Sequence, residues 1–569
     1  MERATRLSIR AAITTIALVL AACGPSAPAG QASPVGGSPA VAKQGGTVRI
    51  TVNQEPDTLN PLFGGGLRVS NTVIQAVFNG LWIADEKGEF QPDLAAEVPT
   101  IQNGGVSADG KTVTVKLRRD VKWADGKPFT AADVKYNYDV ILSPDTTIAK
   151  TTYKNIDSFE VKDDFTFVWK FKDPFPAYLT LFSYPSGIIP KHVLESVPMK
   201  DLSKNDFGRK PFGTGPFRVV SWNAASDITL EANPTYFKGK PKLDKLIFRI
   251  TPDKNTQLAQ LRAGETDMAV DLAETDTPEI ETVAGWKILS VPGLTADRLF
   301  LNLAKPGVAD GSQPHPILAD KKVRQALELG VNKKELVDKI LFGKTTVATG
   351  EYPPKLHWAA ADIDPSKFDA EAAKKLLDDA GWKAGADGVR EKAGVKLSLT
   401  VTGVTGNKLR DDVAALIQAG WKRIGVDMQI RNVAASALVG SWEQNGVVQR
   451  GMFDVAFYGV TVGIDPRGVS LRFQSDQIPR DEPGKTGGGN NMRYRNAEVD
   501  RLADEADRSL DQGKRKEDYV KIQKIVADDV PIIYLYYRAN IEAASDAIVG
   551  PRSHPTRWIT WNVHEWGFR

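Results

Sequence analysis

The side chains able to do chemistry are few, and their spacing fits no familiar catalytic pattern. The 569-residue chain has one cysteine and five histidines. The histidines are scattered along the sequence: His192, His315, His357, His554 and His564. They form no His-Glu-x-x-His pair, and no Gly-x-Ser-x-Gly nucleophile elbow occurs. We expect neither a metal ion nor a cofactor, although scattered carboxylates leave a hydrolase as an alternative.

The position of the lone cysteine, Cys23, is more informative than its thiol. Three arginines precede an apolar run, residues 11–20, which Leu-Ala-Ala-Cys follows at 20–23. This is the pattern of an export signal, and its end resembles a bacterial lipobox, in which the cysteine is lipidated. An ordinary signal peptide with an incidental cysteine is the alternative. We expect residues 1–22 to be removed and Cys23 to anchor the chain extracytoplasmically, on the periplasmic or outer face of the bacterial cell membrane.

The remaining composition predicts a globular protein on a flexible tether. Residues 23–44 are rich in Gly, Pro, Ser and Ala, which is typical of a flexible linker. Removing residues 1–22 lowers the formal net charge from +3 to +1, so nucleic acid is not an expected partner. A lipidated single cysteine leaves none for a disulfide, and stability must come from packed cores.

Hydrophobic periodicity predicts a mixed α/β fold. Apolar residues alternate in 48–52, as in a half-buried strand, and residues 395–430 predict a strand, a helix and a parallel strand. A helix is expected to begin near Asp369, with Gly381 just beyond its C-terminal end. Thr130 with an acidic residue three positions later predicts a capping box.

Several conspicuous residues are expected to be structural. Trp123, Phe129 and Val134 are interpreted as core residues. Asp320, Lys322 and Arg324 are predicted to form a solvated helix face.

Eight segments, read in order, are similar to one known family. They are GGTVRITVNQEPDTLNPLF (45–63), SADGKTVTVKLRRDVKWADGKPFTAADVKYNYD (107–139), GTGPFRVVSWN (213–223), NPTYFKGKPKLDKLIFRI (233–250), ADKKVRQALELGVNKKELV (319–337), AEAAKKLLDDAGW (370–382), RYRNAEVDRLADEADRSLD (493–511) and YVKIQKIVADDVPIIYLYY (519–537). Together they resemble the extracytoplasmic solute-binding proteins of ABC importers, in the peptide/nickel family that includes oligopeptide- and dipeptide-binding proteins.

The resemblance implies an α/β, two-lobed periplasmic-binding-protein-like fold, with mixed sheets flanked by helices and an extra domain inserted in the first lobe. Lobe I would comprise residues 45–88, 213–300 and 533–569, the inserted domain 89–212, and lobe II 301–532. The implied function is capture of a peptide or another organic solute by hinge closure, with delivery to permease and ATPase subunits. A monomer is expected. An oligosaccharide receptor of the same transport class is the alternative ligand hypothesis, and a tethered hydrolase the alternative class.

The resemblance also implies where the ligand binds. One segment follows the first strand, and the other runs from 457 to an Asp-Pro at 465–466. The candidate ligand residues are Asn53, Gln54, Glu55, Tyr458, Val460, Thr461, Val462, Gly463 and Asp465, and the aromatic content of the chain adds Trp442 and Trp561. For Asp465 we favour a turn before proline over direct ligand contact. Asn490 and Asn491 lie in a Gly-rich segment that could border the cleft, but we favour a structural role.

The sequence departs from the peptide binders at two points. In those proteins an acidic residue three positions before this aspartate pairs with the peptide amine, whereas Val462 stands here. An arginine and a tyrosine of the dipeptide binders are replaced by Val404 and Gly406. A buried ammonium group without a counter-charge would be costly. We therefore expect that this pocket does not hold a short peptide by its charged ends.

Overall fold

A ten-stranded mixed sheet organises the chain in the computed structural model, which describes residues 43–569 except 65, 184–186 and 366. Its order is β16-β15-β17-β11-β18-β10-β1-β9-β8-β7. The strands are β1 (Thr47–Val52), β7 (Phe217–Asn223), β8 (Asp227–Ala232), β9 (Lys245–Ile250), β10 (Met268–Ala269), β11 (Trp286–Leu301), β15 (Ser398–Val404), β16 (Asp427–Val433), β17 (Val455–Thr461) and β18 (Ile532–Ser545). The export signal, Cys23 and nearly all of the predicted linker lie outside the described residues.

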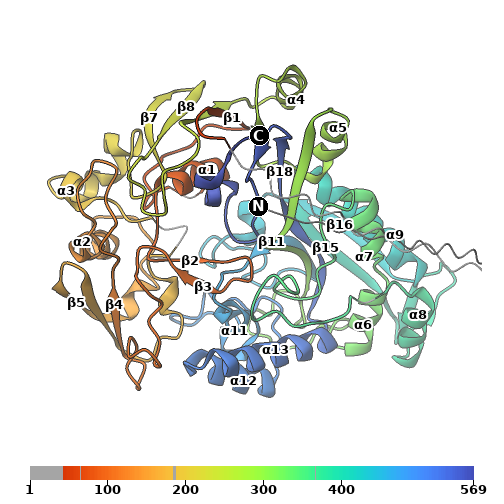
Figure 1. Cartoon of the computed structure of the whole chain (residues 1–569). Helices are drawn as coiled ribbons and strands as arrows, with labels where there is room; N and C mark the ends of the chain where they lie inside the picture. The colour runs from red at the N-terminus through yellow and green to blue at the C-terminus, as the bar shows by residue number, and fades with distance from the viewer. Residues whose placement is uncertain (1–42, 65, 184–186, 366) are drawn as a thin grey trace, which may run out of the picture. The chain divides into compact units, whose positions relative to one another are not determined.

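Two long strands join the two ends of this sheet, and Figure 1 shows β11 and β18 side by side. Their pairing runs from Trp286 opposite Ser545 to Phe300 opposite Ile532, with a first register shift between Pro292 and Ala296 and a second between Asp297 and Arg298. On one side of the shift β18 pairs with β10, and on the other side β11 pairs with β17. β11 and β18 therefore run side by side from the parallel strands β10, β1 and β9 to the parallel strands β17, β15 and β16. A β-bulge interrupts the hydrogen bonds between them on the way.

Helices cover both faces of the sheet formed by β15, β16 and β17. The helices are α6 (Lys321–Leu329), α8 (Ala370–Asp379), α9 (Lys408–Arg423), α11 (Arg467–Phe473), α12 (Ala497–Arg508) and α13 (Gln512–Asp529). Val455 and Phe457 pack with α6, α8 and α9, whereas Ala456 and Tyr458 pack with α11, α12 and α13. Because side chains alternate along a strand, Gly459 falls on the α9 face. The predicted βαβ unit is confirmed, since β15 and β16 are parallel and α9 connects them.

A separate hydrophobic core lies within residues 81–188. An antiparallel sheet of order β4-β6-β5 contributes to it, with β4 (Thr112–Lys116), β5 (Ile156–Asp163) and β6 (Thr166–Phe171). Trp123, Phe129 and Val134 are fully buried in this core, as predicted. The predicted capping box is also present: the Thr130 backbone N–H donates to Asp133 Oδ2 at 3.0 Å, at the start of α2 (Ala131–Leu142).

The remaining elements are shorter or peripheral to the sheet. They are α1 (Arg68–Val77), β2 (Trp82–Ala84), β3 (Phe90–Pro92), α3 (Lys191–Leu194), α4 (Lys254–Ala263), α5 (Thr277–Glu281), α7 (Lys333–Glu335), β12 (Lys383–Ala384), β13 (Arg390–Lys392), β14 (Val395–Lys396), α10 (Ala435–Val439), β19 (Ile548–Val549) and β20 (Gly567–Phe568). The helix predicted from Asp369 is α8. Asp369 caps its N-terminus, and Gly381 beyond its end has a φ of +86°. That left-handed conformation favours glycine.

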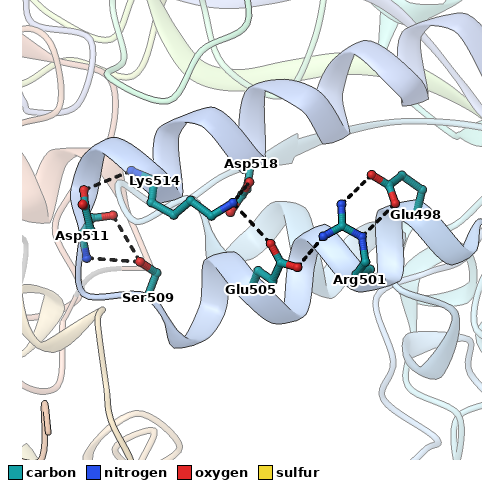
Figure 2. A network of polar contacts seen from close by, with 7 residues as sticks. All are labelled: Glu498, Arg501, Glu505, Ser509, Asp511, Lys514 and Asp518. Carbon is teal, nitrogen blue, oxygen red and sulfur yellow. Dashed lines mark hydrogen bonds and ion pairs between the residues drawn. The ribbon is translucent and has the colours of Figure 1, made fainter.

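A ladder of charged side chains connects α12 and α13 (Figure 2). Arg501 pairs with Glu498 and Glu505, and Lys514 pairs with Glu505 at 3.3 Å and with Asp518 at 2.8 Å. The Asp518 side chain is buried, whereas the other four are exposed. Exposed ion pairs contribute little to stability, so these contacts orient the two helices more than they stabilise them.

The prediction that Arg324 lies on a solvated face of α6 is wrong. Its guanidinium is buried and donates to the backbone carbonyls of Leu318, Ala319 and Asp529. Asp529 is the last residue of α13, where a helix leaves carbonyl acceptors unpaired, and Leu318 and Ala319 lie just before α6. The spacing of charges in the sequence could not show that a second helix ends beside this residue.

Glu542 on β18 gives the fold an expected pH dependence. Its buried carboxyl accepts a hydrogen bond from Ser553 and lies near Arg68 and Asp271. Burial raises the pKa of Glu542 to about 7. The folded chain therefore binds a proton at the Glu542 carboxylate more tightly than the unfolded chain does. The resulting stabilisation is complete below about pH 4.5 and is lost as the pH rises through about 7.

We therefore expect Glu542→Gln to be more stable than the natural chain at pH 8, by up to about 3 kcal/mol, and to differ little at pH 4.5. Urea unfolding at both pH values measures this. An equal difference at the two pH values would contradict the assignment.

Candidate functional site

The end of β17 leaves backbone groups without a strand partner. β15 pairs with β17 only at Val455 and Ala456, whereas β11 pairs with it up to Thr461. The Val462 N–H donates to Leu294 O at 3.0 Å. The N–H groups of every second residue that precedes Val462 in β17 therefore also point toward β11. The peptide groups of Gly459 and Thr461 then point to the opposite edge. Thr461 is exposed and Gly459 half-buried, so this edge is open to a ligand strand.

The predicted ligand residues after Tyr458 alternate between buried and exposed positions. Val462 is buried in the core on the α11–α13 face, and Val460 is half-buried against that core. Thr461 and Gly463 are exposed, and the Thr461 hydroxyl lies 2.7 Å from the hydroxyl of Thr295 on β11. The segment 459–463 therefore offers main-chain groups and small side chains rather than charged groups.

Tyr458 is buried and stacks on Phe300, with ring centroids 4.3 Å apart. Its hydroxyl accepts a hydrogen bond from Asn491 Nδ2 at 3.5 Å. Asn490 is fully buried and donates to the carbonyls of Gln474 and Tyr494, at 3.0 and 2.8 Å. The two asparagines thus hold the loop against β17, which agrees with the structural role we favoured for them.

Asp465 makes the turn that the sequence predicted and an ion pair that it did not. Its Oδ1 accepts from the Arg467 N–H at 3.0 Å, and both of its carboxylate oxygens pair with Arg515, at 2.9 and 3.0 Å. A bidentate pair of this kind fixes the orientation of both groups. The Asp465 side chain is 11% exposed and that of Arg515 7%, so the turn is held rigidly at the edge of the site.

A loop before α8 supports the same segment from behind. The Tyr352 hydroxyl donates to Gly463 O at 3.2 Å. His357 Nε2 donates to Ile464 O at 2.7 Å, while its Nδ1 accepts from the Ala359 N–H. Burial lowers the pKa of His357 to about 4, so the ring is neutral at physiological pH. These contacts hold the backbone of 463–465 in place without adding charge.

A cavity of about 630 Å³ opens beside Asp465. One wall comes from residues 89–179, including Phe90, Ile101 and Tyr178, and the other includes Trp358, Leu510 and Arg515. A size of several hundred cubic ångströms suits an organic ligand, and the lining combines apolar side chains with charged ones such as Asp511. Trp358 also donates its backbone N–H to Lys87 O, which ties the two walls together at 2.8 Å.

The residues predicted after β1 lie at the end of that strand. Asn53 Nδ2 lies 3.4 Å from Asp271 Oδ2, and Gln54 is half-buried. Glu55 accepts hydrogen bonds from Trp222 Nε1 at 2.8 Å and from the Ala225 N–H at 3.1 Å. Glu55 therefore holds the turn between β7 and β8, and its carboxylate already has protein partners.

The predicted tryptophans are each covered by arginine. Trp442 is buried, and the Arg450 guanidinium lies 3.9 Å from its ring centre. Trp561 is half-buried between the guanidinium groups of Arg552 and Arg557, at 4.9 and 4.3 Å. Cation–π contact occupies faces that a ligand would need for stacking.

Sequence reasoning missed Trp358, Arg515 and a cluster of Asp297, Arg410 and Arg538. Arg515 lies in a strongly charged stretch that is typical of a solvated helix, so no signal marked it. Asp297 had a signal, because Asp-Arg interrupts the largely apolar run of residues 294–301. A charged pair in a buried strand indicates partners elsewhere in the fold.

The described residues contain neither a metal-binding cluster nor a membrane-spanning helix. Within that part of the chain, no group of three or more His, Cys, Asp or Glu side chains is placed to hold a metal ion. Likewise, none of the helices described there is long and apolar enough to cross a membrane.

Comparison with known proteins gives the family. Residues 89–477 match the model described as bacterial extracellular solute-binding proteins, family 5 Middle. The chain belongs to this family. By that description family 5 is extracellular, which places the chain outside the cytoplasm. Its relatives are transport-associated binding proteins rather than enzymes.

Individual relatives of family 5 match over almost the whole chain. The oligopeptide-binding protein AppA of Bacillus subtilis is 32% identical over 99% of both chains. Its structure with a nonapeptide covers 93% of this chain and all of AppA, with a TM-score of 0.66 and 31% identity. NikZ of Campylobacter jejuni, in complex with Ni(L-His), covers 92% of this chain and all of NikZ, with a TM-score of 0.68 and 26% identity. The expected fold is therefore correct: a mixed α/β sheet flanked by helices, as in the two-lobed binding proteins.

Proposed function

We propose that this chain is the solute-binding receptor of an ABC importer and that its ligand is a peptide bound along β17. The observation that carries the proposal is the unpaired edge at Gly459 and Thr461, in the segment that leads to Asp465 on the wall of the 630 Å³ cavity. An extended peptide adds to such an edge through main-chain hydrogen bonds, which do not depend on its sequence. Apolar walls such as Phe90, Trp358 and Leu510 then receive side chains.

Binding of the peptide through its main chain explains why the segment 459–463 has no charged side chain to pair with the peptide's termini. Val462 is buried in the core and offers no counter-charge to a peptide amine. The alternatives, an oligosaccharide or a tethered catalytic site, have no comparable observation in their favour. The relatives named as peptide-binding support the peptide reading.

We expect that acetylating the N-terminus of a bound nonapeptide changes its Kd by less than about threefold, because no acidic side chain stands where the amine would need one. Isothermal titration calorimetry of the acetylated and free peptides measures this. Loss of binding on acetylation would refute the main-chain mode. Failure of a mixed nonapeptide library to bind at all, with binding of glycans instead, would refute the peptide ligand.

Ligand capture would proceed by hinge closure at the crossing of β11 and β18. Lobe I (45–88, 213–300 and 533–569) with the insertion (89–212) would close on lobe II (301–532). The register shift at Pro292–Ala296 supports bending there, because the ladder is interrupted. Small-angle scattering with saturating nonapeptide should show compaction, and an unchanged radius of gyration would contradict closure.

Delivery to permease and ATPase subunits would be assisted by a lipid at Cys23. Tethering keeps the receptor near the permease and raises its effective concentration there. Residues 23–44 would act as the flexible spacer. Mass spectrometry of the membrane fraction tests this anchor independently of ligand binding.

A further inference from the structure

A short segment of the chain lies across the joint between β11 and β18. It comprises residues 342–348, which we call the strap, and it follows a π-helical turn at Leu336–Ile340. The strap begins with a sharp bend, because Phe342 and Gly343 have φ values of +52° and +67°. A bulky residue in this left-handed region is strained and keeps that conformation only where the surrounding structure holds it. The contacts of the strap therefore fix its path.

One end of the strap pairs with β18. The Ala348 N–H donates to Leu535 O at 3.2 Å, and an antiparallel bridge joins Val347 to Tyr536. Because β11 occupies one edge of β18, the strap occupies the other edge, which β10 takes farther along the strand. The strap is thus a short third strand next to the register shifts of β11 and β18.

The other end of the strap is held on the far side of those register shifts. Ser290 Oγ donates to Lys344 O at 2.6 Å. Ser290 lies in β11 opposite Ile541, on the side where β18 pairs with β10. The Lys344 ammonium also forms an ion pair with Glu281, the last residue of α5. The strap therefore connects the two parts of the sheet independently of the pairing between β11 and β18.

Water reaches the ion pair at this end of the strap. The Lys344 side chain is 20% exposed and that of Glu281 47%. Exposed ion pairs are weakened by salt and add little to the stability of the whole fold. The strap can therefore detach at Lys344 without unfolding either of the parts that it joins.

We propose that the strap restrains the joint between β11 and β18 and that the Lys344–Glu281 pair is its releasable contact. Tyr536 and Glu281 lie on opposite sides of the register shifts, so bending there changes the distance that the strap must span. The ion pair and the Ser290 hydrogen bond resist that change. This inference rests on the proposed bending at the joint, but it does not depend on which ligand the receptor binds. It also makes the range of motion sensitive to salt.

The test measures distances between two spin labels by electron paramagnetic resonance in the full-length chain without ligand. Ala259→Cys in α4 and Ala415→Cys in α9 provide exposed attachment points on the two sides of the joint. Cys23→Ser removes the natural thiol. The width of the distance distribution then reports how far the joint bends.

We expect Glu281→Gln and Ser290→Ala each to raise the population outside the main distance peak about threefold, and together about tenfold. Lys344→Gln should have the same effect as Glu281→Gln. Raising the salt concentration from about 0.05 M to about 1 M should widen the distribution in the natural chain and change it little in Glu281→Gln, because the variant has lost the charge pair.

Lys334→Gln is the matched control. It removes an exposed lysine that pairs with Asp338 four residues away, so that pair does not span the joint. The control should leave the distance distribution unchanged.

Two results would overturn the strap and leave ligand-induced closure standing, provided that scattering shows compaction with nonapeptide. One is an unchanged distribution in the double variant of Glu281 and Ser290, and the other is equal widening in the control. An unchanged distribution in every variant, together with no compaction, would overturn the bending joint and the strap with it.

Discussion

Gly459→Leu should weaken nonapeptide binding at least tenfold. Even the first atom of the new side chain would lie 2.4 Å from Asp297 Oδ1, closer than non-bonded atoms approach. Since Asp297 is buried between two arginines, the strand and not the aspartate must move. A displaced β17 would lose the alignment of its free edge with the ligand backbone. Calorimetry of the variant against the natural chain measures the change.

Gly468→Ala is the matched control, because a Cβ at this position in α11 meets no atom within 4 Å. Alanine there should bind nonapeptide as the natural chain does and unfold at the same or a slightly higher denaturant concentration. If Gly459→Leu bound peptide normally while remaining folded, the ligand would not use this edge of β17.

The largest stability effect is expected from Glu351→Ala. This carboxylate is fully buried and pairs with Arg298 at 2.7 Å and Arg472 at 2.9 Å, and it accepts a hydrogen bond from the Tyr534 hydroxyl. The two arginines keep the pKa of Glu351 below its usual value, although burial opposes them. Removing the carboxylate leaves two guanidinium groups without their counter-charge in the core of residues 296–537. A loss of about 3–5 kcal/mol in unfolding free energy follows.

Urea denaturation measures this loss, and Glu498→Ala on the exposed face of α12 provides the control. Glu498 pairs with Arg501 in water, so its removal should produce no measurable change. Glu351→Gln, which keeps an acceptor for Tyr534 but not the charge, should fall between the two. Equal stability of Glu351→Ala and the natural chain would show that the buried pair contributes nothing.

Local patterns in the sequence predicted local structure well. Alternation in 395–430 gave the strands and helix of the βαβ unit, and Thr130 with Asp133 gave a capping box, because both depend on neighbours within a few positions. Trp123 and Phe129 were recognised as core residues because large apolar side chains are usually buried. The family followed from eight such segments read in order.

The charged clusters could not be predicted in the same way. Asp297, Arg410 and Arg538 are separated by more than one hundred residues: the pairing of β11 with β18 brings Asp297 and Arg538 together, and Arg410 comes from α9. Arg324 was misplaced for the same reason, since its acceptors come partly from the end of α13. Asp465 shows the mixed case: its turn is local and was foreseen, whereas Arg515 lies fifty residues away.

The joint crossing of β11 and β18 also limits how the molecule can move. The two strands are hydrogen-bonded to each other on both sides of two neighbouring register shifts, so they behave as one ribbon with one short weak region. A two-stranded ribbon of this kind bends or twists as a unit, so the two strands cannot move independently of each other. Arg538 lies in that weak region, so a change at this partly exposed side chain would act on the joint itself rather than on a surface far from it.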